Sequence, residues 1–304
     1  MDLSIVSPVY KAQNLVPILV EEIHEALEPL DKTYEIILVD DGCPNDSWTS
    51  ICQIAESNSR VRGVKLSRNF GQHQAISAGL ESATGEWVVV MDCDLQDDPN
   101  EICSLYSKAK EGFSIVLAKR TNRKHSAFKR YLSKLFYFVF SYLTNTSQDP
   151  TVGNFGIYNR KVIQSILRMG DHIKYFPAQV QWVGFRKTAI PVRHFSRREG
   201  DSTYNLRGLF RLALNNILVF SDKPLRIAVI FGIAVSIVAF CLGTVYLILG
   251  LLGIVTVSGF VSLIAGLFFS TGSIIAVTGM VGLYVGKTFE ASKKRPPFII
   301  EETI

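Results

Sequence analysis

The sequence predicts an α/β domain with a mixed, mostly parallel sheet, followed by a membrane-spanning hairpin of two helices. Two observations predict this class. Over the first 120 residues, short β-rich runs alternate with segments of helical periodicity, which is typical of a parallel sheet covered by helices on both faces. From Ile227 to Gly286 the chain has no charged residue and no Asn, Gln, His or Pro, and this stretch is long enough for two crossings of a hydrocarbon layer about 30 Å thick.

The first part of the chain contains five β-rich runs and four helical patterns in alternation. The runs are Leu3–Val9, Tyr34–Asp41, Arg62–Arg68, Trp87–Asp92 and Phe113–Arg120. The helical patterns are Leu15–Leu30, Ser47–Ser57, Gln72–Ser82 and Asn100–Glu111. Apolar residues of the first helical pattern recur at positions 15, 18, 19, 23, 26, 27 and 30, the spacing of one buried helix face.

Three of the predicted strands end in polar or conformationally special residues. These ends are Pro8 to Tyr10, Asp40 with Asp41, and Asp92 to Asp94. Ligands of open α/β sheets bind beyond the carboxyl ends of the strands. The convergence of these residues therefore predicts a nucleotide site.

The fourth run leads into a dense group of carboxylates. Asp92 and Asp94 are two residues apart, so alternation places both side chains on one side, where hard oxygen ligands suit Mg²⁺ or Mn²⁺ bound to a phosphate. Gln96 continues the alternation and offers a carbonyl oxygen. We expect Asp97 and Asp98 to cap the following helix, where acids suit the positive end of the helix dipole. A phosphatase nucleophile of the DxDxT type is disfavoured, because position 96 is Gln.

Two basic segments with aromatic continuations separate the strand-rich region from the apolar stretch. The first runs from Lys119 to Lys134 and has seven Lys or Arg and no acid. It overlaps a helical pattern near 128–143 that suits a membrane interface, although a core helix with a solvated basic end has the same pattern. The second, Arg186 to Arg211, also has seven Lys or Arg, and it leads into a helical pattern near 206–220.

The cations that flank the apolar stretch predict its orientation. They are Lys223 and Arg226 before it and Lys287, Lys293, Lys294 and Arg295 after it. By the positive-inside rule, both ends face the cytoplasm. We therefore expect a cytoplasmic domain over 1–226, two transmembrane helices within 227–286 and a cytoplasmic tail over 287–304, as a multi-pass protein of the inner (plasma) membrane. The amino terminus lacks the pattern of a cleaved signal peptide, and the five cysteines form no metal-type pairs.

Six motifs together resemble the family-two glycosyltransferases, which have the GT-A fold. The motifs are "SPVYKAQNLV", "ILVDDGCPNDS", "NFGQHQAISAGL", "GEWVVVMDCDLQDDP", "FPAQVQWVGF" and "REGDSTYNL". The resemblance is to dolichol-phosphate mannose synthases and bacterial undecaprenyl-phosphate glucosyltransferases, and it covers essentially the whole chain. It implies a Rossmann-like GT-A domain and a metal-dependent, inverting transfer of a sugar from a nucleotide-sugar to polyprenyl (undecaprenyl) phosphate. Such a reaction supplies lipopolysaccharide or other cell-surface glycan synthesis or modification.

The same resemblance assigns roles to individual residues. The nucleotide-sugar is assigned to Pro8, Tyr10, Asp40, Asp41 and Asp92. Catalysis is assigned to Asp92 and Asp94, which with Gln96 form the site for Mg²⁺ or Mn²⁺ and the diphosphate. The acceptor phosphate and a mobile lid are assigned to Arg120, Arg130, Arg197 and Ser202. Lys129 aligns equally well with the position of Arg130, and each arginine has the alternative reading of an ordinary solvated cation.

The sequence departs from the family pattern at several positions. Ala12 replaces the glutamate of the first motif, Asn154 and Gly156 replace an acid and an arginine of close relatives, and Thr203 replaces a lysine. Loss of an acid at Asn154 is compatible with the reaction, because a polyprenyl phosphate is already ionised at neutral pH and needs no strong base. The main requirements are a divalent ion for the leaving diphosphate and arginines that orient the acceptor.

Two other classes of protein remain as alternatives. A processive polysaccharide synthase would have a QxxRW motif and more spans, whereas "QVQWVGF" lacks the arginine. The second alternative is a non-catalytic membrane partner in lipid-linked sugar handling. A transport path through its spans is disfavoured, because the spans carry no charge.

The net charge of +5 is better explained by basic residues beside a membrane than by nucleic-acid binding. The expected partners are thus the nucleotide-sugar, the polyprenyl phosphate and the lipid bilayer, with a homo-oligomer left open and the sugar and base unspecified.

Overall fold

The computed structural model describes residues 1–120, 152–170, 174–195, 221, 223–252 and 259–304. The described residues belong to two compact units: a sheet domain, which includes 295–304, and a helical unit within 221–294. The helices expected near 128–143 and 206–220 lie outside the described residues, as do Arg130, Arg197 and Ser202.

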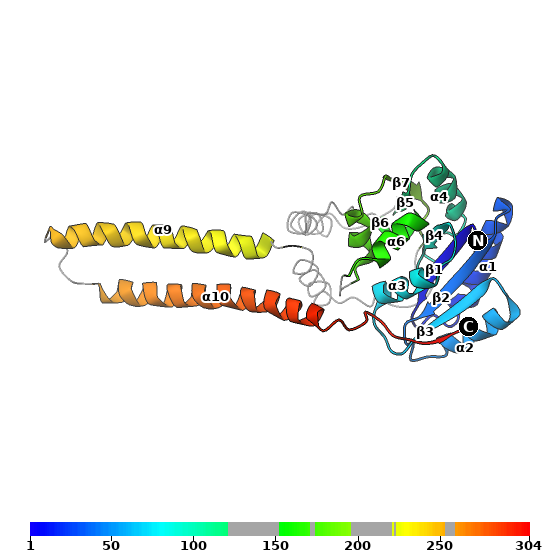
Figure 1. Ribbon diagram of the computed structural model, residues 1–304, viewed down its shortest axis with the longest axis horizontal. Helices are drawn as coiled ribbons and strands as arrows, with labels where there is room; N and C mark the ends of the chain where they lie inside the picture. Colours follow the sequence, from blue (N-terminus) through cyan, green and yellow to red (C-terminus); the bar gives the residue numbers. More distant parts are fainter. Residues whose placement is uncertain (121–151, 171–173, 196–220, 222, 253–258) are drawn as a thin grey trace. The chain divides into compact units, whose positions relative to one another are not determined.

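The described part of the sheet domain contains an eight-stranded sheet in the order β7-β5-β6-β4-β1-β2-β3-β8 (Figure 1). The strands are β1 (Leu3–Val9), β2 (Tyr34–Asp40), β3 (Val61–Leu66), β4 (Trp87–Val90), β5 (Ile115–Arg120), β6 (Val152–Asn159), β7 (Lys187–Val192) and β8 (Ile300–Thr303). The four adjacent strands β4, β1, β2 and β3 run parallel to one another. Strand β6 runs antiparallel between β4 and β5, and β8 runs antiparallel to β3. The predicted mixed, mostly parallel sheet is confirmed.

Helices cover both faces of this sheet. They are α1 (Leu15–Leu27), the 3₁₀ turn η1 (Glu28–Leu30), α2 (Ser47–Ser57), α3 (Gln72–Ser82), α4 (Glu101–Lys110), α6 (Arg160–Leu167) and α7 (Phe176–Trp182). Successive side chains of a strand point to opposite faces, so Leu3 and Ile5 of β1 join a core with α1, α2 and α4. Val6 joins a second core, with α3, α6 and α7. All seven residues of β1 are buried, as expected for a central parallel strand covered on both sides.

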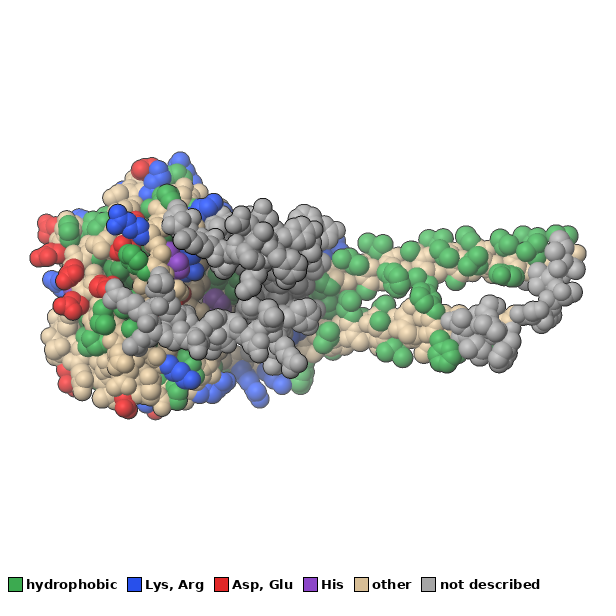
Figure 2. Space-filling view, turned by 180° about the vertical axis from the view of Figure 1, so that it is seen from behind, with side chains coloured by type: hydrophobic (Ala, Val, Ile, Leu, Met, Phe, Trp, Pro, Cys, Tyr) green, Lys and Arg blue, Asp and Glu red, His purple; other side chains and the backbone are tan. Residues whose placement is uncertain are grey.

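The helical unit consists of two long apolar helices, α9 (Lys223–Leu251) and α10 (Phe260–Ser292). Each contains a segment long and apolar enough to cross a membrane, with mean hydropathy 2.6 over Lys223–Tyr246 and 1.6 over Gly266–Ser292. Hydrophobic side chains project outward along both helices (Figure 2), and Phe240 is 76% exposed. Apolar side chains exposed at this density suit a lipid environment, because lipid tails cover them without a protein partner.

The last residues of the chain form an unexpected edge strand of the sheet domain. Strand β8 pairs with β3, with Val64 opposite Thr303, and Lys65 lies 3.2 Å from Glu301. Phe298, just before β8, is only 7% exposed and packs in the second core. The end of the segment 287–304, which was expected to be a cytoplasmic tail, is therefore a strand of the sheet domain.

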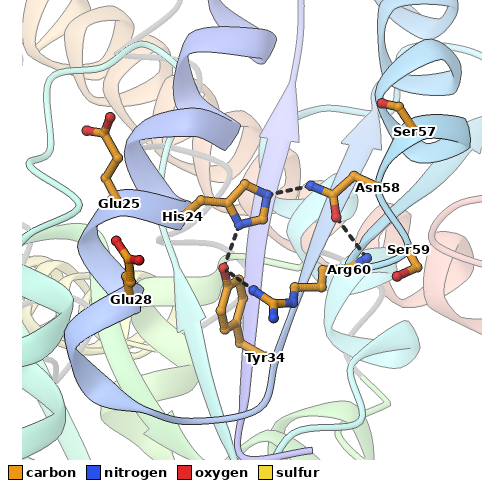
Figure 3. Close-up of a pocket in the computed structure, with 8 residues that line it drawn as sticks. All are labelled: His24, Glu25, Glu28, Tyr34, Ser57, Asn58, Ser59 and Arg60. Carbon is orange, nitrogen blue, oxygen red and sulfur yellow. Dashed lines mark hydrogen bonds between the residues drawn. The ribbon is translucent and has the colours of Figure 1, made fainter.

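A polar network occupies an open pocket of about 490 Å³ beside the amino end of β2 (Figure 3). The amide nitrogen of Asn58 donates to His24 Nε2 at 2.6 Å, so the proton of the neutral imidazole is on Nδ1 and is donated to Tyr34 Oη, also at 2.6 Å. Arg60 donates to the same hydroxyl at 2.9 Å. Burial, with a smaller contribution from Arg60, lowers the pKa of His24. These groups satisfy one another and join α1 to β2 and to the segment between α2 and β3, so we assign them a structural role.

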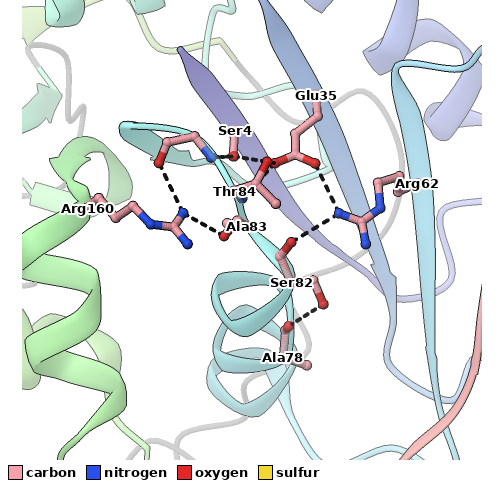
Figure 4. A network of polar contacts seen from close by, with 9 residues as sticks. Ser4, Glu35, Arg62, Ala78, Ser82, Ala83, Thr84 and Arg160 are labelled. Atoms are coloured by element: carbon pink, nitrogen blue, oxygen red, sulfur yellow. Dashed lines mark hydrogen bonds and ion pairs between the residues drawn. The ribbon is translucent and has the colours of Figure 1, made fainter. Parts of the chain in front are cut away.

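A second network at the same end of the strands surrounds the buried carboxylate of Glu35 (Figure 4). Ser4 Oγ and the Thr84 backbone N–H each donate to Oε1 at 2.7 Å, and Arg62 donates to Oε2 at 3.1 Å. Burial favours the neutral acid, but these hydrogen bonds outweigh it and the pKa of Glu35 lies below its usual value. The carboxylate thus joins β1, β2 and β3 to the turn that precedes β4.

Replacing Glu35 with glutamine should destabilise the sheet domain by roughly 2–4 kcal/mol, because it removes charge-assisted hydrogen bonds from a buried site. The Arg62 side chain is 45% exposed, so its ion pair contributes little of this. Since the folded-state pKa of Glu35 is depressed, its stabilisation is present above about pH 4.5, the unfolded value, and is lost as the pH falls through the folded value. Denaturant unfolding in detergent should show that the difference in free energy of unfolding between wild type and Glu35→Gln is smaller at acidic than at neutral pH. The exposed Glu56→Gln variant should have the free energy of unfolding of the wild type at both pH values. An equal loss of stability in both variants would contradict this account.

Candidate functional site

The carboxyl ends of three neighbouring strands meet at one edge of the sheet. Val9 lies opposite Asp40 in the β1–β2 pair, and Val6 lies opposite Val90 in the β1–β4 pair. The strand ends predicted from the sequence to carry a nucleotide site are therefore adjacent in space, with β1 in the centre.

Of the residues assigned to the nucleotide-sugar, Pro8 and Tyr10 lie in β1 and directly after it, and they differ in exposure. Pro8 is buried within β1 opposite Val39, whereas Tyr10, just beyond the strand, is 39% exposed. Lys11 then adopts a left-handed backbone with φ of 55°. Non-glycine residues in this region are strained and cluster at functional sites, so the turn presents Tyr10 at a backbone cost.

Asp40, at the end of β2, is almost fully buried, and its Oδ1 has no hydrogen-bond partner among the described residues. Burial raises the pKa of Asp40, and hydrogen bonds from Cys43 oppose the increase. Cys43 also accepts from the Lys11 backbone N–H at 3.3 Å, which ties the turn after β1 to the turn after β2.

The carboxylate of Asp41 is bound by backbone. Its Oδ1 accepts from the N–H of Phe70 at 2.8 Å, and its Oδ2 accepts from the N–H of Gly71 at 3.0 Å. Burial raises the pKa of Asp41 to about 6 in spite of these hydrogen bonds. In this structure Asp41 holds the loop that precedes α3, so its assignment to nucleotide-sugar binding stays a prediction.

Asp92 follows β4 and is held by two amides. Gln72 Nε2, from the first turn of α3, donates to Asp92 Oδ1 at 2.7 Å, and Asn154 Nδ2, from β6, donates to the same oxygen at 3.4 Å. Burial raises the pKa of Asp92 to about 6, and the charges of Asp97 and Asp94 act in the same direction. Asn154 thus contributes a donor where a carboxylate would add a further negative charge.

Asp94 lies in a tight turn immediately after Asp92. Its Oδ1 accepts from the Gln96 backbone N–H at 3.2 Å, and Leu95 between them has a φ of 56°. The predicted ligands Asp92, Asp94 and Gln96 are thereby confined to one short turn at the strand end.

The residues of this turn fit a hard divalent cation. Among the described residues there is no group of three or more His, Cys, Asp or Glu side chains that could hold a metal by themselves. Mg²⁺ is commonly bound by only one or two carboxylates, with substrate phosphate and water completing the shell. The buried carboxylate of Asp92 lies near two further acids, and a cation would offset this concentration of negative charge.

Asp97 does not cap α4, and that expectation is wrong. Its Oδ1 lies 3.2 Å from His194 Nδ1 and 3.6 Å from Arg120 Nη2. The carboxylate of Asp98 accepts from the backbone N–H of Asn100 at 3.0 Å, and α4 has Asn100 as its N-cap with no side-chain cap, so the cap expected from Asp98 is not formed either. Asp97 does not cap α4 because its carboxylate points into the protein, toward β5 and the segment after β7.

Arg120, at the end of β5, is brought to the carboxylate-rich turn. Its charge opposes the burial that raises the pKa of Asp97 to about 6, and it also opposes the increase in the pKa of Asp92. Of the four residues assigned to the acceptor phosphate, Arg120 is the one within the described ranges, and it lies beside Asp97, three residues after Asp94. Gln72 and His194 are additional site residues that sequence reasoning missed, since a single amide or imidazole has no distinctive spacing.

The comparisons with known proteins agree with this arrangement. Residues 4–168 match the family model described as Glycosyl transferase family 2. The chain is 32% identical over 301 residues to an uncharacterized glycosyltransferase, YkcC, of Bacillus subtilis, with 99% of this chain and 93% of the relative covered. It is also 32% identical over 308 residues to an undecaprenyl-phosphate 4-deoxy-4-formamido-L-arabinose transferase of Klebsiella pneumoniae, with the same coverage. A crystal structure of mannosyl-3-phosphoglycerate synthase from Rubrobacter xylanophilus shares the fold, with a TM-score of 0.50 at 16% identity over 74% of each chain.

Proposed function

The chain belongs to glycosyl transferase family 2, and from this premise we propose that it transfers a sugar from a nucleotide-sugar to a polyprenyl phosphate, with undecaprenyl phosphate as the acceptor. Relatives named for undecaprenyl-phosphate sugar transfer align over 99% of this chain, which includes both apolar helices. A water-soluble acceptor would not require those helices, whereas a lipid acceptor has to be reached at a membrane surface.

The observation that carries the proposal is the position of Arg120, whose Nη2 lies 3.6 Å from Oδ1 of Asp97, in the same segment that carries Asp92 and Asp94. The reaction forms a bond between an acceptor phosphate oxygen and the anomeric carbon, breaks the bond from that carbon to the nucleoside diphosphate and inverts the configuration. Mg²⁺ or Mn²⁺ held by Asp92, Asp94 and Gln96 would stabilise the charge of the leaving diphosphate. The guanidinium of Arg120 orients the acceptor phosphate by charge-assisted hydrogen bonds.

No residue has to remove a proton from this acceptor, because its phosphate oxygen is ionised at neutral pH. Asn154 therefore serves as a donor to Asp92, which it holds together with Gln72. Arg130, Arg197 and Ser202 complete the acceptor site in this proposal, and Tyr10, Asp40 and Asp41 line the donor site.

We assign residues 1–226 to the cytoplasmic face of the inner membrane, with two crossings within 227–286. Strand β8 supports this topology, because it pairs with β3 of the same domain that precedes α9. This pairing favours a topology in which both ends of the apolar hairpin lie on the same side of the membrane. Lys223 and Arg226 before the hairpin and Lys293 to Arg295 after it favour the cytoplasmic side.

The test uses purified full-length protein in detergent or nanodiscs with a panel of radiolabelled nucleotide-sugars. We expect one donor to yield a glycosylated undecaprenyl phosphate carrying a single sugar, with activity lost in excess EDTA and restored by Mg²⁺ or Mn²⁺. A polymeric product would identify a processive synthase instead. Transfer to a water-soluble sugar but to no polyprenyl phosphate would refute the acceptor, and donor binding without turnover would indicate a non-catalytic partner.

A further inference from the structure

The buried carboxylate of Asp97 connects parts of the site that come from different strands. Its side chain is only 1% exposed, and its Oδ1 faces both Arg120 and His194. Its Oδ2 has no hydrogen-bond partner among the described residues. Burying a carboxylate is unfavourable unless it meets a compensating charge, and Arg120 at the end of β5 supplies that charge.

The backbone around Asp97 is fixed on the same side. Asp97 and His194 form an antiparallel bridge, and the Phe195 N–H donates to the Gln96 carbonyl at 2.8 Å. Strand β7, which leads to His194, is paired in parallel with β5, so that Arg120 lies opposite Val192. The turn of Asp92 and Asp94 is thus joined through the backbone to the strand pair that ends in Arg120.

These backbone contacts do not need a carboxylate at position 97, since any residue could make the bridge. What the carboxylate adds is a fixed counter-charge for Arg120. Arg120 Nη2 lies 3.6 Å from Asp97 Oδ1, and without that carboxylate the guanidinium would pair with another acid of the same segment, such as Asp92. An Arg120–Asp92 pair would occupy a candidate metal ligand and withdraw the cation from the acceptor.

We propose that Asp97 is a positioning residue that holds Arg120 beside the turn of Asp92 and Asp94, away from their carboxylates and turned toward the acceptor phosphate. This inference rests on the proposed function for its consequence in catalysis. Its structural part, the restraint of Arg120 by Asp97, does not depend on the identity of the acceptor.

The neighbouring aspartate provides a matched comparison. In Asp97→Asn the counter-charge of Arg120 is lost, whereas in Asp98→Asn the amide oxygen still accepts from Asn100 N and Arg120 is untouched. We expect Asp97→Asn to raise the rate at which an arginine-selective dicarbonyl reagent modifies Arg120, measured by peptide mass spectrometry on full-length protein. We also expect it to raise the KM for undecaprenyl phosphate roughly tenfold, which is the change in affinity expected from the loss of one charge-assisted hydrogen bond. The KM for the donor should change little. Asp98→Asn should leave all three quantities near wild type.

The conservative variant Asp97→Glu keeps the charge but moves it by one methylene group, so its acceptor KM should lie between those of wild type and Asp97→Asn. It also serves as the test if melting curves show that Asp97→Asn does not fold, and a wild-type acceptor KM in Asp97→Glu would then overturn the proposal. Equal modification of Arg120 in wild type and Asp97→Asn, or donor and acceptor KM values that rise together, would also overturn it. If wild type uses no polyprenyl phosphate, the proposed function fails, and the modification rates still decide whether Asp97 restrains Arg120.

Discussion

Replacing Asp94 with alanine is expected to abolish sugar transfer, and Asp92→Ala should be nearly as severe. Both carboxylates lie in the turn after β4, and Gln72 Nε2 holds Asp92 there by donating to its Oδ1 at 2.7 Å. Loss of a metal that stabilises the leaving diphosphate costs several kcal/mol of transition-state stabilisation, which corresponds to a decrease in kcat of about a thousandfold or more. Single-turnover and steady-state assays with saturating donor and acceptor measure this directly.

The control for these variants is Asp98→Ala in the same turn, which removes an acceptor for the Asn100 N–H and should reduce kcat less than tenfold. All three proteins should fold and insert into membranes, as judged by size-exclusion chromatography and melting curves. Full activity in Asp94→Ala or Asp92→Ala, or undiminished wild-type activity in excess EDTA, would count decisively against metal-assisted transfer.

The amino-terminal half of the sheet could be predicted because its strands are buried on both faces and separated by amphipathic helices. The run predicted at Leu3–Val9 is β1, and the pattern predicted at Gln72–Ser82 is α3. Strands β6, β7 and β8 had no such signal. In β7 exposed and partly buried positions alternate, and β8 is exposed throughout, so their existence depends on pairing with β5 and β3 rather than on local composition.

The candidate site was predictable to the extent that strand ends determine it. Asp40, Asp92 and Asp94 could be placed at one edge because parallel strands bring their carboxyl ends together. Gln72 could not, since an amide in the first turn of a helix looks like an ordinary polar residue until the fold brings it to Asp92. Asp97 was misassigned as a cap because its sequence neighbours suggested a helix start, whereas its partner His194 is 97 residues away along the chain.

Gly42 should be nearly irreplaceable, and Gly42→Ala is expected to lower the melting temperature by about 10 °C and to impair donor binding at least tenfold. Its φ is +59°, and an added Cβ would lie 2.2 Å from the carbonyl carbon of Arg68 and 2.4 Å from the nitrogen of Asn69. These are backbone atoms, so no side-chain rotation relieves the clash. The loop after β3 would have to move, and the hydrogen bonds from Phe70 and Gly71 to the Asp41 carboxylate would weaken.

The displacement should reach the catalytic turn as well, because Gln72 directly follows this loop and donates to Asp92. Gly184→Ala is the matched control: its φ is +70°, but the nearest atom to an added Cβ is the Trp182 carbonyl oxygen at 4.0 Å. Both variants carry the left-handed strain of about 1–2 kcal/mol, and only Gly42→Ala adds the backbone clash. Melting curves and calorimetric titration with the donor nucleotide separate the two contributions. If Gly42→Ala behaves like Gly184→Ala in both measurements, the loop before α3 is not held against β2 as described, and Asp41 does not support the donor side of the site.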